Sequence, residues 1–105
     1  MKRVEAIVQS DMAKQVVQAI RDEGVEGITL IQSFGQGQGE RPLIGGKQIE
    51  FNTTDVIMSV IPDSKVNQIV EKIMSVAHTG SKGDGKIFVS EIANSYDIAT
   101  KQKDN

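Results

Sequence analysis

The chain has 105 residues and a formal net charge of −2. Acidic and basic residues are interspersed, so the basic stripe that nucleic-acid binding requires is missing, and nucleic acid is not an expected partner. The absence of cysteine excludes disulfides and thiolate metal sites, and a single histidine argues against a zinc site. The length predicts one domain spanning residues 1–105. Because there is no apolar run near 18 residues and no signal-peptide pattern, we expect a cytoplasmic protein that does not insert into a membrane.

The first half of the chain predicts a strand, a helix and a second strand. Residues 3–8 alternate, with Val4, Ala6 and Val8 on one face. Ser10 or Asp11 can cap a helix over about 11–23, and the glycine that follows at position 24 can end it. Residues 28–34 are rich in β-branched side chains and form the second predicted strand.

The second half repeats this order. Residues 55–61 alternate and end at a proline, and Asp63 or Ser64 can cap the next helix. A strand is predicted over 87–93, and the polar residues 94–105 are expected to be a loose tail. The apolar stripe of the second helix, wide enough to cover a sheet, comprises Val66, Ile69, Val70, Ile73, Met74 and Ala77.

The order β-α-β, long connection, β-α-β predicts an α+β, ferredoxin-like βαββαβ sandwich: a four-stranded antiparallel sheet with two helices on one face. The other face is left bare, and we place Ile7, Ile31, Ile57 and Val89 on it. Because these side chains need cover from water, we expect a symmetric homo-oligomer.

The connection between the second and third strands, residues 36–54, is unusually long for a compact domain, which is typical of a functional segment. Its apolar side chains, Leu43, Ile44, Ile49 and Phe51, are predicted to bind a partner protein. The alternative is a hairpin whose apolar residues pack on one another, although an isolated two-stranded ribbon is only marginally stable.

Residues 79–87 hold three glycines and two lysines directly before an apolar run. Glycines let successive amides converge on an anion, and Lys82 or Lys86 can add charge, so the segment predicts a phosphate cradle, although it lacks the Walker spacing. A flexible link between helix and strand is the alternative. A second glycine-rich segment at 34–39 could face the same ligand. Asp84 is expected to support the loop, His78 to lie at the helix C-terminus, and Met74 to fill the core.

With these elements in place, residues 1 to about 93 resemble the PII family of nitrogen-regulatory signal proteins. The resemblance rests on Thr79 and Gly80 followed by the run GDGKIFV at 83–89, with support from EGVEGIT at 23–29, FG at 34–35 and PD at 62–63. It implies a homotrimer that binds ATP or ADP in the clefts between subunits. It also implies that the long connection, called the T-loop in the family, docks on target proteins.

The resemblance also implies a set of nucleotide-binding positions. Those at 27–29 and 58–60 fall where the family holds adenine and ribose, and the others fall near the phosphates; Met58 stands where glutamate is common. The full set is Gly27, Ile28, Thr29, Gly35, Gln36, Met58, Ser59, Val60, Gly83, Asp84, Gly85 and Lys86.

The chain departs from the family pattern at the phosphates. Gln36, Asp97 and Ala99 stand where the family has arginines. A charge-assisted hydrogen bond contributes about 1.5–3 kcal/mol, so without these arginines nucleotides of lower charge, AMP included, become plausible ligands. Gly37 and Thr54 replace the glutamine and lysine through which typical members bind 2-oxoglutarate, so that response is expected to be absent.

These residues predict a regulatory protein rather than an enzyme, since no nucleophile and base pair can be located. The predicted target is a membrane transporter or its cytoplasmic ATPase subunit, otherwise a metabolic enzyme. Ile49 lies where some members carry a modified tyrosine, so that switch is expected to be missing. A magnesium requirement stays open. The alternative function is a small-molecule or anion sensor that controls carbon or nitrogen enzymes without responding to 2-oxoglutarate.

Overall fold

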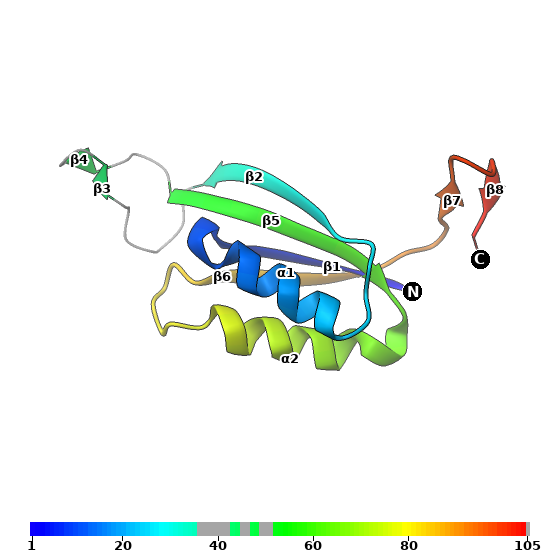
Figure 1. Cartoon of the computed structure of the whole chain (residues 1–105), viewed down its shortest axis with the longest axis horizontal. Coiled ribbons are helices and arrows are strands. Elements are labelled where there is room, and N and C mark those ends of the chain that lie inside the picture. The colour runs from blue at the N-terminus through cyan, green and yellow to red at the C-terminus, as the bar shows by residue number, and fades with distance from the viewer. Residues whose placement is uncertain (36–42, 45–46, 49–51, 105) are drawn as a thin grey trace.

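The computed structural model describes residues 1–35, 43–44, 47–48 and 52–104. Two helices, α1 (Ala13–Asp22) and α2 (Val66–Ala77), cover one face of a four-stranded antiparallel sheet with strand order β2-β5-β1-β6 (Figure 1). This confirms the predicted ferredoxin-like α+β fold. The strands of that sheet are β1 (Lys2–Gln9), β2 (Thr29–Gly35), β5 (Asn52–Ile61) and β6 (Gly85–Glu91). Two short pairs complete the described strands: β3 (Leu43–Ile44) with β4 (Lys47–Gln48), and β7 (Tyr96–Asp97) with β8 (Gln102–Lys103).

The core lies between the sheet and the two helices. As the alternation predicted, the inward face of β1 is buried, and β5 adds two fully buried isoleucines opposite it. The helices meet this surface with their own apolar stripes. The larger members of the core are Val4, Val8, Val16, Ile20, Ile57, Ile61, Ile69 and Ile73.

The bare face of the sheet differs in part from the prediction. Ile7 and Ile31 lie on it, but Ile57 is only 1% exposed beneath the helices, and Val89 also lies on the helix side. Both placements were wrong because successive residues of a strand point to opposite faces, so a shift of one position reverses the side. Phe88, next to Val89, faces outward instead and is half exposed.

The helix starts also differ from the prediction. Short 3-10 turns, Ser10–Met12 and Asp63–Lys65, precede α1 and α2, and neither helix has a side-chain cap. Asp63 instead pairs with the N-terminal ammonium at 3.0 Å, and the bond from that ammonium lowers the pKa of the Asp63 carboxyl. The predicted end of the first helix is confirmed, since Gly24 has a positive φ of 84°.

Two segments expected to be irregular are regular. β5 begins at Asn52, so Thr54 belongs to the sheet and the long connection is confined to residues 36–51. The predicted loose tail folds back as the pair β7 and β8, which lies beyond the end of the sheet (Figure 1). Asp97 stabilises the turn between β7 and β8, because its Oδ1 accepts hydrogen bonds from the amides of Ala99 at 2.8 Å and Thr100 at 3.3 Å. Short-range bonds of this kind give no periodic signal in the sequence.

Candidate functional site

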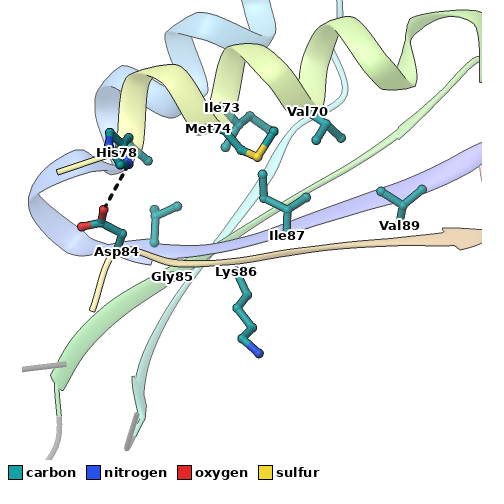
Figure 2. Close-up of a pocket in the computed structure, with 11 residues that line it drawn as sticks. Val70, Ile73, Met74, His78, Asp84, Gly85, Lys86, Ile87 and Val89 are labelled. Carbon is teal, nitrogen blue, oxygen red and sulfur yellow. Dashed lines mark ion pairs between the residues drawn. The ribbon is translucent and has the colours of Figure 1, made fainter. Parts of the chain in front are cut away.

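Residues 78–84, here called the glycine loop, connect α2 to β6 and are organised around one carboxylate. Asp84 Oδ2 accepts hydrogen bonds from the amides of Thr79 at 2.6 Å and Gly80 at 2.9 Å, and the Thr79 hydroxyl donates to Asp84 Oδ1. His78 Nδ1 lies 3.8 Å from Oδ2 (Figure 2). The bonds from the Thr79 hydroxyl and amide, helped by the Gly80 amide and by the charge of His78, lower the pKa of the Asp84 carboxyl. Asp84 therefore supports the loop as its ionised form.

Three further hydrogen bonds, two to hydroxyl oxygens and one to a carbonyl, stabilise the rest of the glycine loop. The Ser81 amide donates to Thr79 Oγ1, the Gly83 amide to Ser81 Oγ and the Asp84 amide to the Ser81 carbonyl, each at 3.2 Å. The amides of Thr79, Gly80, Ser81, Gly83 and Asp84 thus have partners within the loop, and the anion at its centre is the Asp84 carboxylate. An external phosphate would have to meet the outside of the loop or replace these 3.2 Å contacts, which are at the long end of the normal range.

Gly85 anchors the loop to the sheet. Its φ is +117°, and a Cβ at this position would lie 1.8 Å from the carbonyl oxygen of Ile7. Only glycine allows this approach, so the chain leaves the loop and joins β1 in one fixed register, with Gly85 opposite Val8.

The glycine loop lies at the same end of the sheet as both ends of the long connection (Figure 1). The Gln9 side-chain amide donates to the carbonyl of Gly83, and Gln9 pairs across the sheet with Thr54. The Thr54 hydroxyl in turn lies 3.1 Å from the Ser33 hydroxyl on β2. A continuous set of contacts therefore runs from the loop to the two strands that carry the connection. Sequence reasoning missed Gln9, because a contact between positions 74 residues apart leaves no local pattern.

A cleft of about 370 Å³, here called the α2–β6 cleft, opens beside the loop (Figure 2). Its walls are apolar, with His78 and Asp84 at one end. Met74, expected in the core, is 52% exposed here, because β6 is the edge strand of the described sheet and leaves this side of α2 uncovered. Lys86 points away from α2, toward the bare face (Figure 2). The cleft is lined by Val8, Val70, Ile73, Met74, Ala77, His78, Asp84, Gly85, Lys86, Ile87 and Val89.

The predicted nucleotide-binding residues divide into two groups within one chain. Gly35, paired with Asn52, lies at the glycine-loop end. Thr29 begins the same strand six residues earlier, roughly 20 Å away at 3.3 Å per residue. Thr29 pairs with Met58, so the positions around 27–29 and 58–60 form the second group. Gln36 lies outside the described residues.

Ser59, another predicted nucleotide-binding residue, is buried, with only 4% of its surface exposed. Its hydroxyl donates to the carbonyl of Gly27 at 2.7 Å and so positions the second group. Among the predicted partner-binding residues, Leu43 and Ile44 form β3, and Ile49 and Phe51 lie outside the described part of the chain.

The described residues lack two features that would point to a metal site or a membrane span. In these parts of the chain, no three histidine, aspartate or glutamate side chains are grouped so that they could hold a metal ion. No helix within the described ranges combines the length and apolar character needed to cross a bilayer.

Comparison with known proteins finds one family over nearly the whole chain. A family model described as "Nitrogen regulatory protein P-II" matches residues 1–102. A protein of the same description from Azospirillum brasilense is 36% identical over 107 residues, covering 98% of this chain and 96% of that protein. A third match, "Nitrogen fixation nifHD2 region GlnB-like protein 1" from Methanosarcina barkeri, is 31% identical over 103 residues and covers 98% of each chain.

Proposed function

Because the chain belongs to the PII family of nitrogen regulatory proteins, we propose that it is a non-enzymatic cytoplasmic signal protein that binds an adenine nucleotide and controls a target through residues 36–51. The observation that carries the proposal is the contact path from Gly83 through Gln9 to Thr54 and Ser33. A ligand that changes the glycine loop can move both ends of the long connection by this path. The ligand can shift the equilibrium between two conformations of the connection only by the difference between its affinities for them.

The nucleotide site is assembled from two copies of the chain. The glycine loop and Gly35 lie at one end of the sheet, and Thr29 and Met58 begin the second group roughly 20 Å away. One molecule cannot bring both groups onto one nucleotide, whereas adjacent subunits can. The bare face supports this assembly, because Ile31 and Phe88 are each 52% exposed on it. We propose the family homotrimer, with a nucleotide in each cleft between subunits.

The chain lacks positive charges at several positions where the family has them, which favours a nucleotide of low charge. Lys86 is the second residue of β6. Its side chain is exposed on the bare face, where it can pair with a phosphate. Asp97, at a position where the family has arginine, uses its carboxylate to hold the β7–β8 turn. Thr54, at a position where the family has lysine, contacts Ser33. We therefore propose that ADP or AMP binds at least as well as ATP and that 2-oxoglutarate has no effect.

Calorimetry with ATP, ADP and AMP tests the ligand. We expect binding in the micromolar to millimolar range, and Lys86→Ala should weaken it at least about tenfold. Lys72→Ala, an exposed lysine on α2, is the matched control and should leave binding unchanged. If none of the three nucleotides binds at about 1 mM, the proposal is wrong. A clear gain in ATP affinity on adding 2-oxoglutarate with magnesium would contradict the role assigned to Thr54.

The proposed target is a membrane transporter or its cytoplasmic ATPase subunit, otherwise a metabolic enzyme. A pull-down with the intact protein should recover this target, and a variant lacking residues 38–51, which keeps Asn52 and the whole of β5, should lose it. Recovery of the same partner by both proteins would show that the long connection is not the docking element.

A further inference from the structure

A second hollow lies on the helix side of the sheet, toward the β2 edge, whereas the glycine loop leads into β6 at the opposite edge. It is a groove of about 900 Å³ between α1 and the edge strand β2, here called the α1–β2 groove. Asp55 of β5 lines it and is only 5% exposed. Asp55 Oδ1 accepts a hydrogen bond from the Ser10 hydroxyl at 2.9 Å. In the described part of the chain, Oδ2 accepts none.

A carboxylate at this depth needs more than one neutral donor. Its two oxygens offer about four acceptor positions, and burial without compensating bonds or a counter-charge is costly. The Ser10 hydroxyl supplies one bond and no charge. The open side of Asp55 therefore fits a ligand that brings a positive charge with several N–H donors, which describes a primary ammonium group.

The wall formed by α1 adds both signs of charge. Asp11, Lys14 and Arg21 all line the groove, and their spacing of three and seven residues places them on one side of the 3-10 turn and helix. Asp11 follows Ser10 and so lies at the Asp55 end. Arg21 lies about 15 Å farther along at 1.5 Å per residue. The two carboxylates and two cations cancel, which suits a ligand that is itself zwitterionic.

Apolar side chains from both walls of the groove lie between these charges. Val17 and Leu30 line the groove, and Leu30 is 45% exposed because α1 does not cover β2. A hydrocarbon portion of a ligand can therefore lie between the anionic end and Arg21. The volume falls within the usual range for small-molecule sites.

We propose that the α1–β2 groove binds a free α-amino acid. The ammonium group bonds to Asp55 with help from Asp11, the carboxylate pairs with Lys14, and the side chain lies over Val17 and Leu30 toward Arg21. Arg21 favours an amino acid with an acidic side chain. A divalent metal is disfavoured, because two carboxylates and one hydroxyl supply fewer oxygen ligands than calcium or magnesium requires. A phosphate is disfavoured by the charge of Asp55.

Calorimetry on the full-length protein with matched small molecules tests the class of ligand. Alanine, leucine and glutamate should bind, glutamate most tightly. Propionate, which lacks only the amine of alanine, and ethylamine, which lacks only its carboxylate, should bind at least about tenfold more weakly than alanine. Failure of all three amino acids to bind at about 10 mM overturns the proposal, as does propionate binding as well as alanine.

Two variants test the residues. Asp55→Asn keeps the shape and removes the charge, and should weaken amino-acid binding at least about tenfold, whereas Glu71→Gln on α2 should not change it. Lys14→Ala is exposed and does not threaten folding, so it provides an independent test with Lys72→Ala as its control. Wild-type affinity in a folded Asp55→Asn protein or in Lys14→Ala would refute the site. Nucleotide binding, which involves other residues, should be unaffected by either variant.

Discussion

Thr79 donates two hydrogen bonds to Asp84, one from its amide to Oδ2 at 2.6 Å and one from its hydroxyl to Oδ1. The same hydroxyl oxygen accepts from the Ser81 amide. A single side chain therefore ties the start of the glycine loop to its end and to its middle.

Replacing Thr79 by valine should loosen the loop without disturbing the sheet. Valine keeps the amide and the shape but removes both hydroxyl bonds. We expect amide hydrogen exchange at Gly80 and Ser81 to become at least about tenfold faster, with exchange in the core strands unchanged. Thr100→Val, in the β7–β8 turn, should leave the glycine loop as it is. Unchanged exchange in Thr79→Val would show that the network does not hold the loop.

Acid should release the same loop. The pKa of Asp84 lies below its ordinary value of 3.8, so the ionised form is favoured in the folded protein. Its contribution is fully present above 3.8 and is lost as the pH falls from that value through the lower pKa of the folded state. Chemical shifts of the Thr79 and Gly80 amides should report this titration at strongly acidic pH. In Asp84→Asn these shifts should not titrate in that range.

Three glycines allow a graded test of backbone constraint. Gly85→Ala should lower the free energy of unfolding by about 2 kcal/mol or more, because the positive φ and the contact with Ile7 both oppose a side chain. Gly80→Ala, with φ +91° but open space, should cost about 1 kcal/mol. Gly27→Ala, with neither constraint, should be nearly neutral. Urea denaturation measures all three, and equal effects would contradict the assigned role of Gly85.

Ser59→Ala should destabilise the protein by removing a hydrogen bond that holds residues 27–29. Removing the buried hydroxyl leaves the Gly27 carbonyl without this donor, and the free energy of unfolding should fall by about 1 kcal/mol. Ser75→Ala, exposed on α2, should change it by less than about 0.5 kcal/mol. If both variants have the same stability in urea, the bond does not hold residues 27–29.

The bare face should be an interface between copies. Phe88 and Met74 are each 52% exposed, but Phe88 lies on the bare face and Met74 in the α2–β6 cleft. Phe88→Asp should therefore reduce the molar mass seen by light scattering to that of a smaller assembly, while Met74→Asp should preserve the trimer. A wild-type monomer, or a trimer that survives Phe88→Asp, would contradict the proposed assembly.

Periodicity and the glycine-loop motif were enough to predict the fold, because both helices carry a clear apolar stripe and β1 alternates regularly. The faces of Ile57 and Val89 were assigned wrongly, since both strands have apolar residues on adjacent positions and alternation alone does not distinguish the sides. The β7–β8 turn was missed because Asp97 forms it through short-range bonds that any polar tail could make.

The glycine loop could be located from the sequence, but its hydrogen-bond arrangement could not. The run GDGKIFV identified the loop, but its hydrogen-bond pattern depends on which carboxylate occupies its centre, and Asp84 does so here. The bond between Ser10 and Asp55 joins distant positions, so only the folded chain shows that a carboxylate is buried beside α1.

The central strand β1 is the first to be synthesised, yet both of its partners, β5 and β6, come from the second half of the chain. The nascent sheet therefore has no complete central pairing until residue 91 has left the ribosome. Such a high sequence separation predicts slow, largely post-translational folding. It also means that an N-terminal fragment ending in the long connection would hold two strands that do not pair with each other.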